Sequence, residues 1–181
     1  MRIIAGVKRG TKLLPPYNNN VRPTADRVKE AIFGRLQFEI QDAVVLDLFA
    51  GSGALGLEAV SRGAAEAFLV DSDSRAIDVI EQNVRKTGFE NSVKIIKKDY
   101  ADAIKEFKNK LKFDIVLIDP PYSSGFYQSA VELIAESGIL QDGGIVVLES
   151  AMAMESAYGG MDIEKTKKYG KTYVTYLKGG V

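Results

Sequence analysis

Short apolar runs alternate with helical stretches from residue 43 onward, and this alternation constrains the fold more than any other feature. The runs are rich in Val, Ile, Leu and Phe, as expected for strands whose two faces are both covered. They span 44–49, 66–71, 92–97, 113–118 and 144–149. Helical stretches lie between them at 54–62, 73–87, 100–110 and 126–138. Repeated strand–helix units predict a parallel, doubly wound α/β sheet with right-handed crossovers.

The two ends of the chain depart from this alternation. Residues 161–168 and 171–178 predict a closing antiparallel hairpin around Tyr169-Gly170, which brings the expected sheet to seven strands. Residues 1–20 predict an extended or hairpin arm, and a helix over 24–38 follows with Thr24 as its N-cap. We therefore expect a basic N-terminal arm and helix over 1–40 and a Rossmann-like domain over 41–181.

Charge is distributed unevenly along the chain, although the formal net charge is zero. Residues 1–36 hold eight basic side chains and two acids, so this segment carries +6 and the remainder −6. A basic segment on an acidic body is typical of proteins that bind a polyanion. The alternative is a charged face that only contacts solvent.

The chain contains neither cysteine nor histidine. Disulfides, thiolate metal sites and a covalent Cys nucleophile are thereby excluded, as are Ser-His catalysis and the usual zinc sites. We expect chemistry that depends on carboxylates, backbone groups and a cofactor, with no metal. The N-terminus resembles no signal peptide and no apolar stretch is long enough to span a membrane, so we expect a cytoplasmic protein that does not contact membranes.

A glycine-rich turn follows the first apolar run and indicates a ligand site. Asp47-Leu-Phe-Ala-Gly51-Ser-Gly53-Ala-Leu-Gly56 places small residues where a strand turns into a helix, so the backbone can approach a ligand closely. Acids lie at the carboxyl ends of the first three strands: Asp47 inside the end of the first, Asp71 as the last residue of the second, and Asp99 just after the third. They suit an ammonium group, ribose hydroxyls and an adenine amino group respectively, a combination that describes S-adenosylmethionine and fits NAD less well.

Simpler interpretations of these residues remain open. The glycines could serve tight packing of a helix on a strand, and Asp73 is better explained as a helix N-cap than as a ligand. A metal-binding Asp71-Ser72-Asp73 motif is disfavoured because no other acid cluster supports it. The predicted cofactor-binding residues are Asp47, Phe49, Gly51, Ser52, Gly53, Asp71, Ser72, Asp99, Tyr100 and Asp119.

The tetrapeptide Asp119-Pro120-Pro121-Tyr122 ends the fourth apolar run and predicts the catalytic site. An exocyclic amino group on a base is a poor nucleophile, because its lone pair is delocalised into the ring. Proline has no backbone N–H, so this loop presents carbonyl acceptors without competing donors. We predict that Asp119 and the Pro120 carbonyl each accept one amino proton, and that Tyr122 stacks on the base. A loop merely stiffened by proline is the alternative.

These motifs, taken with the N-terminal segment, resemble the bacterial ribosomal small-subunit methyltransferase D family. The similarity covers nearly the whole chain and rests most specifically on Arg22-Pro-Thr24 with Asp26-Arg27-Val28. The other matching motifs are Arg2-Ile-Ile-Ala-Gly6, Asp47-Leu-Phe-Ala-Gly-Ser-Gly53, Asp119-Pro-Pro-Tyr122 and Tyr169-Gly-Lys-Thr172. Asp71 occupies a position that is often Glu in the family, and either carboxylate can bind a ribose.

The resemblance implies a class I S-adenosylmethionine-dependent methyltransferase fold. It further implies methylation of N2 of guanine 966 in 16S ribosomal RNA, on an assembling small subunit. We expect the protein itself to be a monomer. The RNA contacts would come from Lys8, Arg9, Arg22, Thr24 and Arg27.

Three other functions remain possible from the residues themselves. DNA adenine-N6 methylation would use the same chemistry, but the chain lacks a second block of residues to recognise a duplex sequence. A non-catalytic RNA-binding assembly factor conflicts with the intact Asp119-Pro-Pro-Tyr122 motif. A dehydrogenase would require NAD, which the acid after the first strand disfavours.

Overall fold

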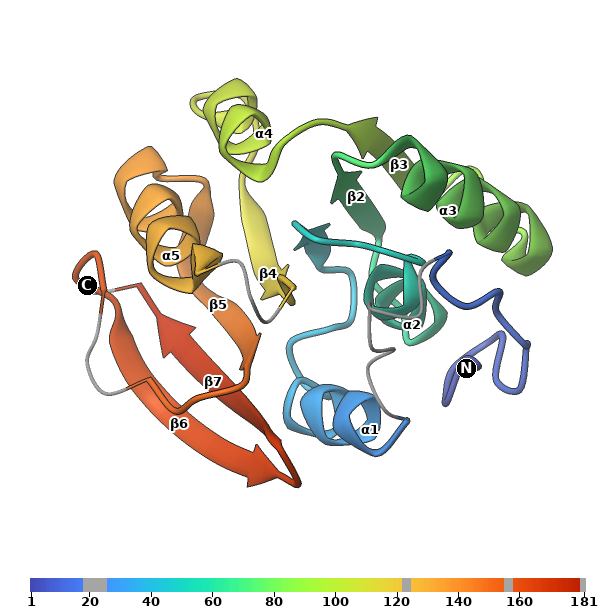
Figure 1. The fold of residues 1–181 in the computed structure, drawn as a ribbon, viewed down its shortest axis with the longest axis horizontal. Helices are drawn as coiled ribbons and strands as arrows, with labels where there is room; N and C mark the ends of the chain where they lie inside the picture. Colours follow the sequence, from blue (N-terminus) through green and yellow to red (C-terminus); the bar gives the residue numbers. More distant parts are fainter. Residues whose placement is uncertain (18–25, 122–124, 155–157, 180–181) are drawn as a thin grey trace.

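The computed structural model describes residues 1–17, 26–121, 125–154 and 158–179. Its strands form one mixed sheet in the order β3-β2-β1-β4-β5-β7-β6 (Figure 1). The strands are β1 Val44–Asp47, β2 Glu66–Asp71, β3 Val93–Lys97, β4 Phe113–Ile118, β5 Leu140–Ser150, β6 Asp162–Tyr169 and β7 Thr172–Lys178. The first five strands pair in parallel, and β7 pairs antiparallel with β5 and β6. The predicted seven-stranded, mostly parallel sheet with a C-terminal antiparallel hairpin is thus confirmed.

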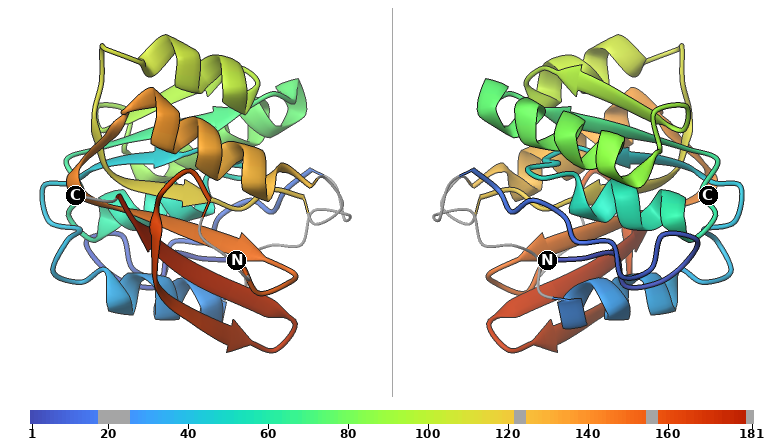
Figure 2. Two further views of the ribbon diagram at one scale, coloured as in Figure 1. Left: turned by 90° about the vertical axis from the view of Figure 1, so that its left-hand side faces the viewer. Right: turned by 90° about the vertical axis from the view of Figure 1, so that its right-hand side faces the viewer.

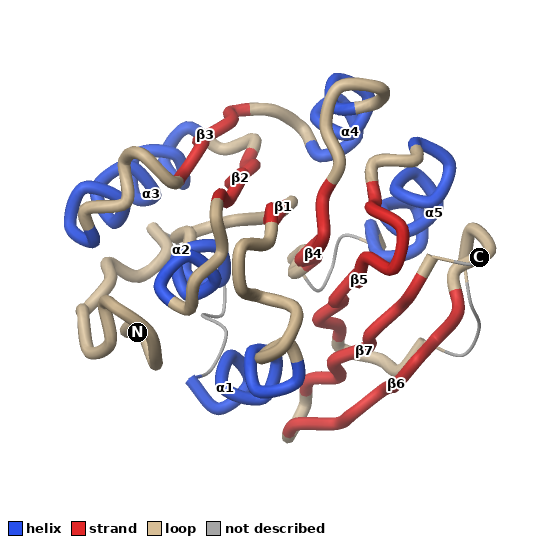
Figure 3. The backbone as a smooth tube through the Cα atoms, turned by 180° about the vertical axis from the view of Figure 1, so that it is seen from behind, coloured by secondary structure: helices blue, strands red, loops and turns tan. Residues whose placement is uncertain are grey.

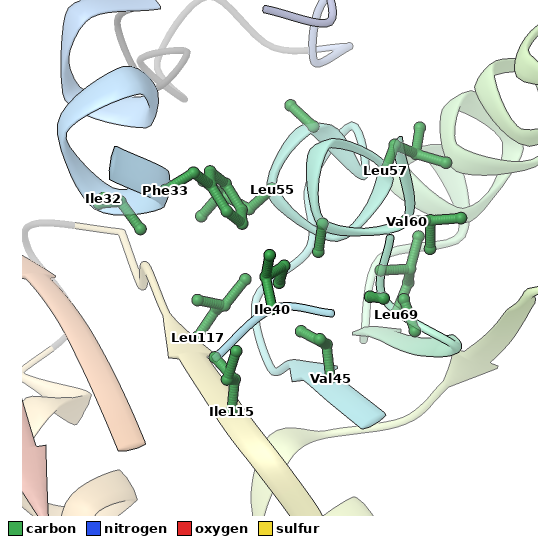
Figure 4. Packing of buried hydrophobic residues seen from close by; sticks show 14 of the residues in the cluster. Ile32, Phe33, Ile40, Val45, Leu55, Leu57, Val60, Leu69, Ile115 and Leu117 are labelled. Atoms are coloured by element: carbon green, nitrogen blue, oxygen red, sulfur yellow. The ribbon is translucent and has the colours of Figure 1, made fainter. Parts of the chain in front are cut away.

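Helices cover both faces of the sheet (Figures 2 and 3). They are α1 Asp26–Arg35, α2 Ala54–Ser61, α3 Ser74–Thr87, α4 Tyr100–Phe107 and α5 Phe126–Ser137. Buried residues of α1, α2 and α3 pack with one face in a single apolar cluster, part of which Figure 4 shows. A second cluster joins α4 and α5 to the opposite face. This three-layer arrangement is what the alternating pattern predicts for a doubly wound sheet.

Several element boundaries differ from the sequence-based expectation; β1, for example, ends at Asp47 rather than at residue 49. The fifth strand begins at Leu140 rather than at residue 144, because Leu140 already pairs with Phe113 across an irregularity in the ladder. Helix α4 ends at Phe107 because Asn109 has a φ of +62°, which stops the helix. Helix α1 ends at Arg35, and the next residues form a turn. Thr24, its predicted N-cap, lies outside the described residues.

The first 17 residues form the expected hairpin-like arm, and this arm packs against the domain. Arg2 and Lys12 form an antiparallel bridge, and the Ile3 N–H donates to the Thr11 carbonyl at 3.0 Å. Ile3 is fully buried. Gly6 has a φ of +82°, and a Cβ there would lie 1.7 Å from the Ser61 carbonyl oxygen at the end of α2. Only glycine allows the arm to lie this close to the helix.

Buried polar side chains of two helices bind the backbone of the arm. The Glu58 carboxylate in α2 accepts from the Ile4 and Ala5 N–H groups at 2.7 and 3.0 Å. The Asn83 amide in α3 accepts from the Leu14 N–H at 2.7 Å and donates to the Leu14 carbonyl at 3.1 Å. Asn83 also donates to the Ser52 carbonyl at 2.9 Å, so one side chain joins the arm to the glycine loop.

Candidate active site

A cavity of about 300 Å³ opens at the carboxyl edge of the parallel strands. The loops that follow β1, β2, β3 and β4 line it, together with the last described residues of the arm, Pro16 and Tyr17. In a parallel sheet these loops necessarily meet at one edge, which is why open α/β folds bind ligands there. The fold therefore brings the predicted cofactor loop and the predicted catalytic loop to one cavity.

The glycines of the loop after β1 have different roles. Gly51 lines the cavity with a φ of +58°, and a Cβ there would meet no atom within 4 Å. A Cβ on Gly56 would instead lie 2.1 Å from Leu69 Cδ2, so this glycine lets α2 pack closely on β2. Gly53 is similarly tight, since a Cβ would lie 3.2 Å from Leu69 Cδ1. Close packing thus explains Gly53 and Gly56, whereas Gly51 leaves space at the cavity, where a ligand could approach the backbone.

Asp47 is buried behind this loop and does not line the cavity. Its side chain is only 1% exposed, and Oδ2 accepts from the Gly56 N–H at 3.1 Å. Oδ1 has no hydrogen-bond partner among the described residues. Burial, opposed by the Gly56 hydrogen bond and assisted by the nearby Asp119 and Asp71 carboxylates, raises the pKa of Asp47 to about 7. Direct contact with a cofactor ammonium group, as predicted from the sequence, would require the cavity to reach this carboxylate.

Ser52 and Gly53 also do not line the cavity. Ser52 is 4% exposed, and its carbonyl accepts from Asn83. These residues shape the loop from behind, so their predicted role in cofactor binding would be exerted through Gly51.

The acids after β2 form a hydrogen-bonded unit at the cavity. Asp71 accepts from the Gly51 N–H at 2.9 Å with Oδ2 and from the Asp73 N–H at 2.9 Å with Oδ1. Asp73 caps α3 by accepting from the Arg75 N–H at 2.8 Å, which confirms the predicted N-cap. Asp71, Ser72 and Asp73 all line the cavity. Asp71 thereby connects the glycine loop to the second strand.

Tyr17 extends this unit into the arm. Its hydroxyl donates to Asp73 Oδ2 at 2.5 Å, and the Arg75 guanidinium lies 4.2 Å from the centre of its ring. The hydrogen bonds from Arg75 and Tyr17 hold the pKa of Asp73 well below its usual range. The N-terminal arm therefore forms part of the cavity, a role that the sequence analysis missed. No local pattern signals it, because the contacts join residues more than 50 positions apart.

The loop after β3 supplies an acid and an aromatic ring. Asp99 caps α4 by accepting from the Ala101 N–H at 2.9 Å, and both Asp99 and Tyr100 line the cavity. Tyr100 packs against Phe49 and Phe126, with ring centres 5.1 and 5.3 Å away. The Tyr100 hydroxyl lies 2.8 Å from Ser129 Oγ, which fixes the ring. The rings of Phe49, Tyr100 and Phe126 thus form an aromatic wall of the cavity.

Asp119, Pro120 and Pro121 extend β4 directly into the cavity lining. Tyr122, the predicted stacking residue, lies outside the described residues. Phe126, at the start of α5, also lines the cavity and stacks on Phe49 at 6.2 Å with an interplanar angle of 11°. Phe126 therefore provides an aromatic surface in the same cavity as Asp119, independently of Tyr122.

Charge at the cavity is predominantly negative. Asp71, Asp73, Asp99 and Asp119 line it, whereas Lys98 is its one lysine among the described residues and pairs with Glu106 at 2.5 Å. Such an environment disfavours a pyrophosphate and favours a ligand with cationic groups. The described residues contain no group of three or more metal-ligating side chains.

Comparison with known proteins agrees with this geometry. The family model for conserved hypothetical protein 95 matches residues 1–178. Ribosomal RNA small subunit methyltransferase D of Haemophilus influenzae is 35% identical, over 83% of this chain and 78% of that protein. Its Escherichia coli counterpart is 37% identical, over 83% and 74%. The chain belongs to the ribosomal small-subunit methyltransferase D family. The solved structure of yhhF from Escherichia coli has a TM-score of 0.87 at 32% identity, covering 100% of this chain and 99% of that one.

Family membership accounts for the class I methyltransferase fold and for the two loops that share the cavity.

The predicted RNA-binding residues of the arm that the structure describes do not line this cavity. Lys8 and Arg9 are exposed, but the Lys8 backbone binds Ser61 at the end of α2, and its Nζ lies near Gly88 at the end of α3. Since α3 starts at the cavity and has 14 residues, the Lys8 ammonium lies about 20 Å from it.

The other basic residues of the arm differ in accessibility. Arg27 is exposed in the first turn of α1, whereas Arg22 and Thr24 lie outside the described residues. Lys29 is fully buried beside Glu58, at 3.8 Å, and burial lowers its pKa. The charge of the N-terminal segment therefore overstates the number of cations that a polyanion can reach. Within the described part of the chain, no helix is long and apolar enough to cross a membrane.

Proposed function

We propose that this protein transfers a methyl group from S-adenosylmethionine to the exocyclic N2 of a guanine in 16S ribosomal RNA. The family resemblance suggests guanine 966 on an assembling small subunit, and the names of the relatives support a ribosomal RNA substrate. One observation carries the proposal: Asp119, Pro120 and Pro121 line the same cavity as Gly51 and the acids after β2 and β3. In this proposal the donor site and the acceptor site for the amino group adjoin.

The residues at the cavity fit S-adenosylmethionine better than a dinucleotide. This cofactor has a sulfonium, an ammonium and no phosphate, which agrees with the four acids of the cavity. Asp71 and Ser72 would hold the ribose, and Asp99 with Tyr100 would hold the adenine. Gly51 leaves room for the methionine end, and Asp47 supports that end from behind by fixing the start of α2.

The catalytic loop acts on the amino group of the base. When bound, the cofactor supplies a methyl group activated by its positive sulfur. Asp119 and the Pro120 carbonyl accept the two amino protons, which turns the nitrogen lone pair out of conjugation and toward the cofactor side of the cavity. Positioning and electrostatics supply most of the rate. The cationic product nitrogen loses its proton readily to solvent, so the absence of histidine is no obstacle.

The target base must leave its helix or be unpaired to enter the cavity. Phe126 then offers a flat surface beside Asp119. Its side chain is 39% exposed, which is unusual for a phenylalanine that serves core packing alone.

Mass spectrometry of ribosomal RNA nucleosides tests the proposal. Assembling small subunits incubated with the protein and S-adenosylmethionine should gain N2-methylguanosine. Methylation of adenine in duplex DNA instead, or binding of RNA without any methyl transfer, would overturn it.

An Asp119→Ala variant tests the assigned role of the loop. It should lower methyl transfer by about a hundredfold or more, while cofactor affinity stays within a few-fold. Asp78→Asn, which changes an exposed acid of α3, is the matched control and should change neither. Equal loss of transfer and of cofactor binding in Asp119→Ala would show damage to the cavity instead.

A further inference from the structure

The Tyr169-Gly170-Lys171-Thr172 motif forms the turn of the β6–β7 hairpin, and the cavity makes no use of it. Around this turn lie four exposed lysines, Lys165, Lys167, Lys168 and Lys171, which we name the hairpin lysines. Residues 165–178 contain no acid at all, in a chain whose net charge is zero. This is a local concentration of positive charge outside the N-terminal segment.

The strand register places the turn at the same edge of the sheet as the catalytic loop. Ile118, the last residue before Asp119, pairs with Leu148, which pairs with Thr175. The turn at Gly170 and Lys171 lies about four residues beyond that level, so it projects about 13 Å past the end of β4. It stands two to three strands to the side of β4, about 10–15 Å away. The left panel of Figure 2 shows the turn and the start of α5 on the same side of the molecule.

The hairpin lysines are not committed to internal contacts. The two acids of the hairpin lie at its other end, where Glu164 pairs with Arg35 and Lys178 at 2.6 and 3.0 Å. Within the described ranges, no carboxylate pairs with a hairpin lysine. Lys168 lies 5.1 Å from the centre of the Tyr173 ring, which supports its side chain without neutralising it.

Protection of the edge strand against aggregation is the competing explanation. Lysines on an outer strand such as β6 do prevent strands of other molecules from pairing with it. Lys171, however, lies in the turn and not on the strand. Edge protection also does not require that acids be absent, or that lysines gather at the end nearest the cavity.

We propose that the hairpin lysines form a second RNA-binding surface, which contacts phosphates of the RNA that flanks the target base. This inference rests on the proposed function for the identity of the nucleic acid. The turn projects beyond the cavity mouth, and the lysines surround it, so a strand entering the cavity passes within their reach. The Lys8 ammonium, by contrast, lies about 20 Å from the cavity.

The test compares two triple variants that remove equal charge. Lys167→Gln/Lys168→Gln/Lys171→Gln changes the turn. Lys108→Gln/Lys110→Gln/Lys112→Gln changes three exposed lysines before β4, at the opposite edge of the sheet. Binding of a 16S ribosomal RNA transcript is measured over a range of salt concentrations, with S-adenosylmethionine affinity and thermal unfolding as checks on folding.

The hairpin variant should bind the transcript about tenfold or more weakly near 0.1 M salt, with a log–log salt slope smaller by about 2. The control should stay within twofold of the original protein, and cofactor affinity should be unchanged in both. Unchanged RNA binding in the hairpin variant, or equal losses in the two variants, would overturn the proposal. So would a loss seen with assembling subunits but not with the transcript, because the surface would then contact protein.

These outcomes are separable from failure of the proposed function. If the original protein transfers no methyl group and the hairpin variant still loses RNA binding, the RNA surface stands without the enzymatic assignment. If transfer to 16S RNA occurs and the hairpin variant binds normally, only the surface is refuted.

Discussion

The N-terminal arm and the C-terminal hairpin are both basic, but the domain holds them in different ways. Buried side chains of α2 and α3 bind the backbone of the arm, through Glu58 and Asn83. The hairpin is attached by the antiparallel ladder between β7 and β5, and the hairpin lysines face solvent. The arm is therefore part of the structure around the cofactor cavity, whereas the hairpin can offer its charges to a partner. Charge counted along a sequence does not distinguish these two situations.

Removing the acid that anchors the arm should have the largest effect. Glu58→Gln leaves the buried Lys29 ammonium without its counter-charge, so the free energy of unfolding should fall by about 3–5 kcal/mol. Glu164→Gln is the matched change in the hairpin, where the side chain is 30% exposed, and should lower it by at most about 1 kcal/mol. Urea denaturation measures both. Similar losses in the two variants would contradict the distinction between arm and hairpin.

Stability should also depend on pH at the glycine loop, to which the arm is bound. The pKa of Asp47 is about 7 in the folded protein and 3.8 ordinarily, so the folded state holds a proton that the unfolded state has released. The contribution of the protonated Asp47 to the free energy of unfolding is therefore complete below pH 4 and is lost as the pH rises to about 7. It amounts to about 4 kcal/mol, since one pKa unit corresponds to about 1.4 kcal/mol.

The side chain at position 47 cannot ionise in the Asp47→Asn variant, so the variant should lack this pH dependence, and the difference in unfolding free energy between the two proteins should change between pH 4 and pH 7. Denaturation of the cofactor-free protein at several pH values between 4 and 8 measures it. Parallel curves for the original and variant proteins would show that Asp47 is not buried as described.

Asn83 tests whether the arm and the glycine loop act together. Asn83→Ala leaves the Leu14 N–H and the Leu14 and Ser52 carbonyls without this partner, which should cost about 2–3 kcal/mol of stability. Cofactor affinity should fall with it, because Ser52 belongs to the loop. Thr166→Val removes the hydrogen bond to Thr175 in the hairpin and should leave cofactor affinity unchanged. Calorimetry that shows full affinity in Asn83→Ala would separate the arm from the cofactor site.

The smallest effect is expected for the tyrosine at the end of the arm. Tyr17→Phe removes the hydroxyl that binds Asp73, which should weaken cofactor binding by about two- to fivefold, or about 0.5–1 kcal/mol. Tyr173→Phe makes the same chemical change in the hairpin and should leave cofactor affinity unaltered. Equal cofactor affinities by calorimetry for the original protein, Tyr17→Phe and Tyr173→Phe would mean that the arm borders the cavity without contributing to binding.

Much of the fold was predictable because its signals are local. Runs of Val, Ile and Leu between helical stretches identify the strands, and the carboxyl ends of parallel strands must meet at one edge. The convergence of Asp71, Asp99 and Asp119 on one cavity follows from that rule. The start of β5 was misplaced because Gln141–Gly144 is polar and glycine-containing, although it extends a strand.

Other parts of the site depend on long-range packing and carry no local signal. Asp47 was expected to face a ligand, but the close approach of α2 to β2 directs its carboxylate to Gly56. Tyr17 reaches the cavity only because side chains from α2 and α3 hold the arm in place. Lys29 looks like any other basic residue in the sequence, and its burial is decided by a residue 29 positions away.

The reversal of direction at the end of the sheet has a topological consequence. The chain leaves β5 with Ser150 at the edge that carries the catalytic loop, and begins β6 with Asp162 at the opposite edge. Strand β7 then runs back between β6 and β5, so the last connection of the sheet is a tight turn at the edge of the catalytic loop. A turn of two residues occupies little space there, which leaves an approach for a molecule as large as a folded RNA.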